Sequence, residues 1–144
     1  MKTILIALLF LLSGPVTDWK LDFKAAKTEA IATHKMILLN FSGSDWCGPC
    51  IKLKKDVFES PEFETFATQN LVLVRADFPR QKKNQLPKEQ VALNEALAEQ
   101  YNPKGTFPLT VLLDGKGKVV REWEGYQPSV SGFIGEIANA SGAK

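Results

Sequence analysis

The stretch Trp46-Cys47-Gly48-Pro49-Cys50 decides the fold, and it holds the only two cysteines of the chain. Residues 36–41 before it are mostly apolar, and the run is short enough to form a buried strand. Residues 42–45 interrupt this run, and apolar side chains then recur at near-helical spacing, at Ile51, Leu53, Val57 and Phe58. The first cysteine is therefore predicted to lie where a loop enters a helix.

A helix start favours a reactive thiolate at Cys47. Free backbone N–H groups and the helix dipole attract an anion there, and such a site lowers a cysteine pKa from about 8.5 to roughly 3.5–7.5. Pro49 suits the first helical turn, where its missing N–H costs nothing. We therefore predict thiol–disulfide exchange, with Cys47 as the exposed nucleophile and Cys50, one turn further, as the shielded resolving cysteine.

This motif, placed between a strand and a helix, resembles the active site of the thioredoxin family. A second patch, Thr106-Phe107-Pro108, precedes the apolar residues 109–113 and resembles the proline loop of that family. The resemblance covers residues 18–140. It implies a cis peptide bond before Pro108, a proline that faces the cysteines, and substrate binding by Trp46, Phe107 and Pro108.

The residues between the cysteines indicate the direction of the reaction. Gly48 and Pro49 resemble the reducing members of the family, whereas strongly oxidising members usually carry a histidine there. A cation at that place would stabilise the thiolate and thus the reduced form, so its absence makes the dithiol a better reductant. Asp45 acts in the same sense if its charge stays near the sulfur. Asn40 stands where many thioredoxins carry a buried aspartate, so either water or another carboxylate carries the proton of Cys50, or resolution by Cys50 is slow.

The favoured function is a protein-disulfide reductase that needs no bound cofactor, because the cysteines carry the electrons. An oxidase or isomerase of exported proteins is one alternative. A redox-inert binding or chaperone module with the same fold is the other. A zinc site lacks ligands, since two cysteines and the only histidine, His34, fall short of four. A purely structural disulfide is disfavoured because so short a loop removes little chain entropy.

The N-terminus resembles a secretory leader. Lys2 precedes the apolar residues 4–12, a run too short to span roughly 30 Å of hydrocarbon as a helix. We expect residues 1–17 to be a signal peptide and residues 18–144 to form one thioredoxin-like domain, exported to a periplasm or secreted. In such a compartment a reductase needs an electron donor, for example a membrane thiol–disulfide relay.

Composition limits the expected partners to protein or peptide disulfides and that donor. The net charge of +2 gives no argument for nucleic acid or a membrane surface. We expect a monomer with no stable membrane insertion once the leader is removed.

The remaining pattern predicts an α/β fold, with a central mixed sheet flanked by helices and a C-terminal β-hairpin and helix. Strands are expected at residues 36–41, 71–77, 109–113 and 119–124. Helices are expected before residue 35, after Cys47, from Ser60, over 88–101 and near the C-terminus. Residues 19–21 are the only candidate for a first edge strand. Asp22, Ser60 and either Ser129 or Ser131 are predicted helix caps.

Side-chain positions follow from the same pattern. The first helix should bury Phe23, Ala26, Ala30 and Ile31, and the helix over 88–101 should bury Val91, Leu93, Leu97 and Tyr101. Arg75 should face outward near its strand end, and His34 should be a surface residue. Residues 78–88 form a basic irregular segment, either a solvated loop or a docking site for an acidic partner.

Overall fold

The computed structural model describes residues 17–142. The expected leader therefore lies outside the described residues, apart from Thr17. A five-stranded sheet in the order β1-β3-β2-β4-β5 forms the centre of the molecule. Its strands are β1 (Trp19–Lys20), β2 (Met36–Ser42), β3 (Leu71–Asp77), β4 (Leu109–Leu113) and β5 (Val119–Glu124).

The sheet is mixed, as the sequence predicts. β3 pairs in parallel with both β1 and β2, while β4 pairs antiparallel with β2 and with β5. The two central strands are nearly continuous apolar runs because helices cover both faces of the sheet.

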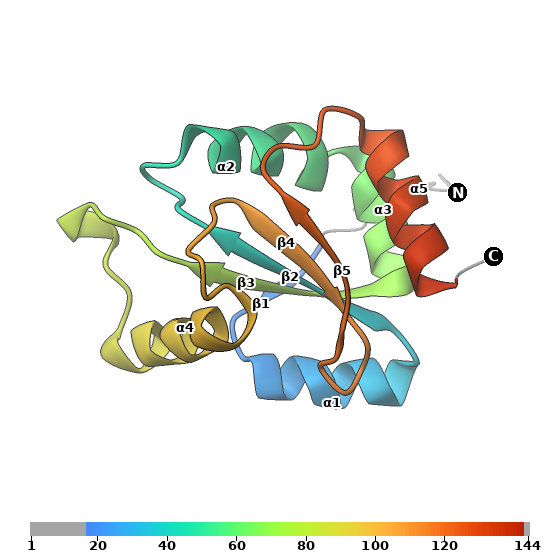
Figure 1. The fold of residues 1–144 in the computed structure, drawn as a ribbon, viewed down its shortest axis with the longest axis horizontal. Coiled ribbons are helices and arrows are strands. Elements are labelled where there is room, and N and C mark those ends of the chain that lie inside the picture. The colour runs from blue at the N-terminus through green and yellow to red at the C-terminus, as the bar shows by residue number, and fades with distance from the viewer. Residues whose placement is uncertain (1–16, 143–144) are drawn as a thin grey trace, which may run out of the picture.

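Helices lie on both sides of this sheet (Figure 1). One face carries α1 (Phe23–Thr33) and α4 (Lys88–Tyr101), and the other carries α2 (Gly48–Leu53), α3 (Pro61–Asn70) and α5 (Val130–Ser141). A π-helical turn, Lys54–Phe58, continues α2, and a short 3₁₀ turn, Lys82–Asn84, lies in the basic segment. The molecule is therefore a three-layer α/β domain, with α2 beginning just beyond the end of central strand β2.

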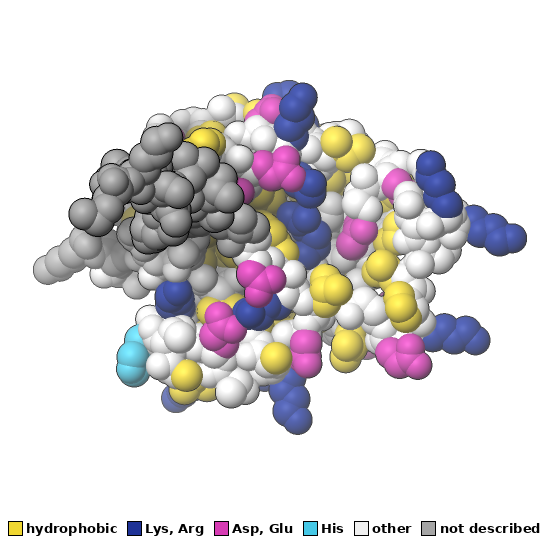
Figure 2. Space-filling view, turned by 180° about the vertical axis from the view of Figure 1, so that it is seen from behind, with side chains coloured by type: hydrophobic (Ala, Val, Ile, Leu, Met, Phe, Trp, Pro, Cys, Tyr) yellow, Lys and Arg dark blue, Asp and Glu magenta, His cyan; other side chains and the backbone are white. Residues whose placement is uncertain are grey.

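The surface carries charges of both signs, which Figure 2 shows for the face opposite to that of Figure 1. Among residues 17–142 no helix is both long and apolar enough to cross a membrane. His34 is exposed and ends α1 with a left-handed backbone, at φ 55°, as expected for a surface residue.

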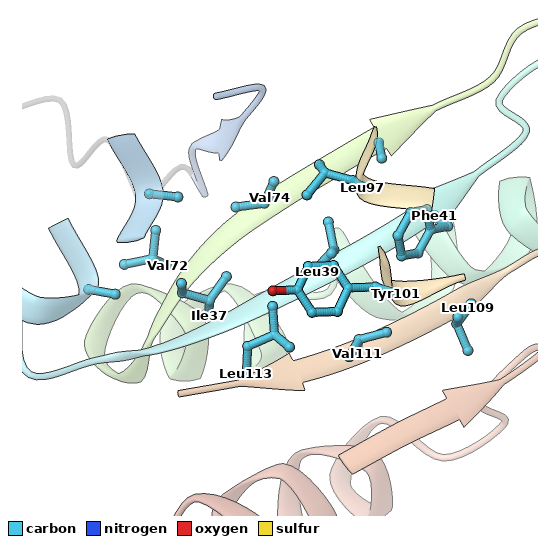
Figure 3. Packing of buried hydrophobic residues seen from close by; sticks show 13 residues of the cluster. Ile37, Leu39, Phe41, Val72, Val74, Leu97, Tyr101, Leu109, Val111 and Leu113 are labelled. Atoms are coloured by element: carbon cyan, nitrogen blue, oxygen red, sulfur yellow. The ribbon is translucent and has the colours of Figure 1, made fainter. Parts of the chain in front are cut away.

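Alternation along β2 divides the core into two clusters. Ile37, Leu39 and Phe41 point toward α1 and α4, where they pack with Leu97 and Tyr101 (Figure 3). Leu38 belongs to the opposite cluster, which the side chains of α2, α3 and α5 complete. β2 is thus fixed from both sides, and so is the loop that follows it.

The predicted caps and the hairpin turn are confirmed. Asp22, Ser60 and Ser129 accept the N–H of the third residue after them, at 3.0–3.2 Å, at the starts of α1, α3 and α5. In the hairpin, Asp114 Oδ1 accepts the N–H groups of Lys116 and Lys118, each at 2.9 Å. These side chains predict the ends of the elements well, because each one bonds to a backbone N–H only a few residues away.

Three side-chain predictions are wrong. Ile31 and Leu93, expected in the core, are 57% and 49% exposed. Asn94 occupies the buried position on α4 instead, because its Nδ2 donates to the carbonyl of Asp77 at 2.9 Å. Arg75 is half-buried rather than outward, with its guanidinium 4.3 Å from the ring centre of Trp19.

Candidate active site

The two cysteines lie at the N-terminal end of α2, as predicted. Cys47 is the N-cap residue, Gly48 begins the helix and Pro49 lies in its first turn. Cys47 and Cys50 form a disulfide with an S–S distance of 2.11 Å. The N–H of Cys50 also donates to Cys47 Sγ at 3.3 Å. The helix start therefore supplies a donor directly to the first sulfur.

Both cysteines are buried in this disulfide form. Cys47 is 5% exposed and Cys50 is 3% exposed. The expectation of an exposed Cys47 is thus wrong for the oxidised state. The disulfide turns Cys47 Sγ toward α2, where Cys50 also donates its N–H to it.

Trp46 is fixed beside the disulfide by contacts with distant segments. Its Nε1 donates to the carbonyl of Phe78 at 2.7 Å, and its ring meets Phe107 edge-on at 5.4 Å. The indole covers the buried Gly43, so closely that a Cβ there would lie 2.6 Å from Trp46 Nε1. The glycine leaves the space into which Trp46 folds, a role that sequence reasoning missed.

The predicted proline loop lies next to Trp46. The Phe107–Pro108 peptide bond is cis, as the resemblance implies. Asn102 fixes the loop, because its side chain donates to the carbonyl of Thr106 at 2.8 Å and accepts its N–H at 2.9 Å. Nothing in the sequence marked the buried amide of Asn102 as a brace of this loop.

An aromatic hollow of about 610 Å³ lies between Trp46 and the proline loop. It is lined by Trp46, Phe78, Pro79, Arg80, Gly105 and Phe107. Two of the three predicted substrate-binding residues, Trp46 and Phe107, thus share one hollow, whereas Pro108 is buried and does not line it.

Asp45 is engaged away from the disulfide. Its carboxylate accepts the N–H groups of Arg80 and Gln81, each at 2.9 Å, and the Nδ2 of Asn84 at 3.0 Å. The N–H of Arg80 is the main reason why the pKa of Asp45 lies below its usual value. This carboxylate therefore tethers the segment after β3, which the sequence analysis did not foresee.

A second hollow, of about 370 Å³, lies behind Cys50. It is lined by Ser42, Ser44, Cys50, Ile51, Lys54, Lys55, Glu59, Arg75 and Asp77. Burial lowers the pKa of Arg75, and among the described residues its buried Nε has no hydrogen-bond partner. The hollow thus holds ionisable groups next to the second cysteine.

Asn40 is 2% exposed, and its Nδ2 donates to Thr110 Oγ1 at 3.2 Å and to the carbonyl of Leu109 at 3.4 Å. It is held as a structural amide between β2 and β4. The carboxylates that line the hollow with Cys50 are Glu59 and Asp77. Within residues 17–142 no three His, Cys, Asp or Glu side chains converge as a metal site requires.

Comparison with known proteins agrees with this geometry. A family profile described as a thioredoxin-like domain matches residues 23–133. The disulfide bond reductase DsbH of Chlamydia pneumoniae is 43% identical over 108 residues, which are 74% of this chain and 63% of that protein. The thioredoxin-related protein DsbJ of the same organism is 40% identical over 60 residues, which are 42% of this chain and 17% of that protein. The match thus spans less than two thirds of either curated relative.

Solved structures extend the comparison to the whole domain. A structure described as DsbH oxidoreductase matches with a TM-score of 0.82 at 30% identity, covering 99% of this chain and 96% of that chain. A thioredoxin from Thermus thermophilus matches with a TM-score of 0.62 at 19% identity, over 85% of each chain, which is a likeness of fold alone. By its profile match, its sheet and its disulfide at the start of α2, the chain belongs to the thioredoxin-like family.

Proposed function

We propose that this chain is a thiol–disulfide oxidoreductase that reduces protein or peptide disulfides, with Cys47 as the nucleophile and Cys50 as the resolving cysteine. The observation that carries the proposal is the Cys47–Cys50 disulfide at the N-terminal end of α2. The N–H of Cys50, which donates to Cys47 Sγ, would stabilise a thiolate there after reduction.

The reaction proceeds in two exchanges. The Cys47 thiolate attacks one sulfur of the substrate disulfide, that S–S bond breaks, and the leaving thiolate takes a proton from solvent. Cys50 then loses its proton, and its thiolate attacks Cys47 Sγ in the mixed disulfide, which releases the second substrate thiolate. Two electrons pass to the substrate, and the enzyme is left as the Cys47–Cys50 disulfide.

Substrate binding is assigned to the residues beside the disulfide. Trp46 and Phe107 offer an aromatic surface that an extended peptide can cover. Pro108, joined to Phe107 by a cis peptide bond, ends the loop that Asn102 braces. The peptide would lie along this loop as an added strand.

The reducing direction rests on Gly48 and Pro49. Neither residue supplies a cation to stabilise the thiolate, so the dithiol should be a good reductant. Asp45 is left out of this assignment, because its carboxylate is hydrogen-bonded to the segment after β3. The Chlamydia pneumoniae relative DsbH is named a disulfide bond reductase, which supports the same direction. A dithiol donor, such as a membrane thiol–disulfide relay, would regenerate the enzyme, and no bound cofactor is required.

Export to a periplasm or to the outside of the cell is proposed from the leader-like residues Lys2 and 4–12. A fusion of residues 1–17 to a reporter that is active only after export tests this. A reporter that stays inactive in the cell would contradict it.

The decisive experiment mixes the reduced protein with a peptide disulfide and follows release of peptide thiol. Cys47→Ser should abolish the reaction, and Cys50→Ser should accumulate a peptide–Cys47 mixed disulfide that mass spectrometry detects. A potential near about −270 mV, measured against glutathione, supports a reductase, whereas about −120 mV assigns an oxidase instead. Full function of Cys47→Ser in a binding or chaperone assay would favour the redox-inert module.

A further inference from the structure

The segment between β3 and α4 carries an unbalanced positive charge. Residues 78–88 include four basic side chains and no acidic one, Arg80, Lys82, Lys83 and Lys88. All four are exposed, and within the described part of the chain none of them forms an ion pair. Figure 2 shows basic side chains projecting from the edge of the molecule opposite the grey residues, where this segment lies.

The segment is held against the active site rather than free in solvent. The carboxylate of Asp45 accepts hydrogen bonds from the N–H groups of Arg80 and Gln81 and from Nδ2 of Asn84. Gln81 Nε2 donates back to the carbonyl of Asp45 at 3.2 Å. Four hydrogen bonds thus join the basic segment to the residue that stands two positions before Cys47.

One basic side chain reaches the substrate hollow itself. The guanidinium of Arg80 lies 3.7 Å from the ring centre of Trp46, and Arg80 lines the hollow together with Phe107. A peptide that lies across Trp46 therefore meets this cation at once. Lys82 and Lys83 follow in the 3₁₀ turn and extend the positive edge outward from the hollow.

The acidic side chains that border the segment leave this edge positive. Asp45 keeps its single negative charge, because the donors of the tether are neutral N–H groups, and it stands against the three cations Arg80, Lys82 and Lys83. Glu95 and Glu99 line a different hollow, which shares only Phe78 and Gly105 with the aromatic one. The net charge of the segment beside Trp46 is therefore positive.

We propose that residues 80–83 select substrates in which acidic residues flank the target disulfide. This inference rests on the proposed function and names the substrate class of the same site. The aromatic surface beside the disulfide binds without regard to charge, and Arg80, Lys82 and Lys83 add an attraction that only an acidic segment receives. The occupant of this edge is thus an acidic, disulfide-containing stretch of an exported protein.

The test compares three cyclic peptides that share one disulfide and differ only in flanking residues, which are acidic, amide or basic. Reduced protein is mixed with each peptide, the reaction is followed by tryptophan fluorescence, and the time course gives the second-order rate constant. At low salt the acidic peptide should react about tenfold faster than the amide peptide, since each of the three exposed ion pairs contributes a factor of about 1.5 to 5. In concentrated salt, with a Debye length of about 3 Å, the preference should fall below about twofold.

Two double variants test whether Lys82 and Lys83 cause the preference for the acidic peptide. The double variant Lys82→Gln/Lys83→Gln should react about three- to tenfold more slowly with the acidic peptide and unchanged with the amide peptide. The amide peptide thus controls for any change in the reactivity of Cys47. The matched control, Lys116→Gln/Lys118→Gln, removes the same charge from exposed positions in the hairpin, beyond the far end of β4, and should leave the preference intact.

Each outcome separates the two proposals. Equal rates on the three peptides, with the amide peptide still reduced, would overturn the acidic selectivity and leave the reductase assignment standing. Failure to reduce any peptide would overturn the proposed function and this inference with it. Strong inhibition by an oligonucleotide, with none by an acidic peptide that lacks a disulfide, would assign the basic edge to nucleic acid instead.

Discussion

Gly43→Ala should destabilise the protein and displace Trp46. A Cβ at residue 43 would lie 2.5 Å from Cζ2 and 2.6 Å from Nε1 of the indole, below the 3.0 Å limit of real Cβ contacts. The indole cannot retreat freely, because Nε1 is bonded to the carbonyl of Phe78 and Arg80 lies over its face. Gly43 is not among the glycines with a left-handed backbone, so the effect isolates packing from backbone strain.

The size of the effect follows from these contacts. Forcing a methyl group into a packed site costs about 1–3 kcal/mol. Loss of the Trp46–Phe78 hydrogen bond, if the indole moves, adds about 0.5–1.5 kcal/mol. We expect the free energy of unfolding to fall by about 2–4 kcal/mol, out of a total of about 5–15 kcal/mol for a domain of ordinary stability.

Urea denaturation of the oxidised protein, followed by fluorescence, measures this loss. The matched control is Gly135→Ala in α5, where a Cβ would meet nothing within 4 Å. That variant should gain about 0.5–1 kcal/mol, because alanine loses less backbone freedom than glycine in a helix. A Gly43→Ala protein within about 0.5 kcal/mol of wild type, with an unchanged Trp46 indole N–H resonance, would refute the packing argument.

Three further predictions concern buried or tethering polar groups. Asn40→Asp should destabilise the protein near neutral pH and less in mild acid; burial raises a carboxyl pKa, so stability is lost as the pH rises through it, which thermal melts at several pH values would reveal. The pKa of Asp45 is lowered, so its tether stabilises the folded protein above the unfolded pKa of 3.8, and this stabilisation is lost as the pH falls below that value. Asp45→Asn should therefore make stability depend less on pH in acid, and it should speed tryptic cleavage at Lys82 and Lys83. Asn94→Ala should cost about 1–3 kcal/mol in denaturant titrations, because it leaves the last carbonyl of β3 without its buried donor; a loss below about 0.5 kcal/mol would contradict that role.

The elements themselves were largely predictable from the sequence. The strand over 71–77 and the helix over 88–101 have the predicted bounds, and the cap residues Asp22 and Ser60 function as expected. Signals of this kind are local, since a cap or an apolar run is read within one or two turns of chain. The position of the cysteines at the start of α2 followed from the same local pattern.

The contacts that shape the site were not predictable in this way. Asp45 binds partners that lie 35 to 39 residues further along the chain, so its apparent proximity to Cys47 in the sequence was misleading. Leu93 was expected in the core because it is apolar, yet Asn94 is buried, since a strand carbonyl required a donor at that position. Such choices depend on which groups the folded chain leaves unsatisfied, and a hydrophobic pattern does not record this.

The tether between Asp45 and the basic segment holds a ligand site against the cysteine pair, so that ligand binding and the reduction potential can be coupled. Any acidic ligand that binds the reduced form more tightly than the disulfide form must raise the reduction potential of the Cys47–Cys50 pair by the corresponding free energy. A tenfold difference in affinity corresponds to about 30 mV for this two-electron couple. Reciprocally, formation of the Cys47–Cys50 disulfide would lower the affinity for the ligand by the same factor. Reduction of the substrate, which oxidises the enzyme, would thus favour release of the product.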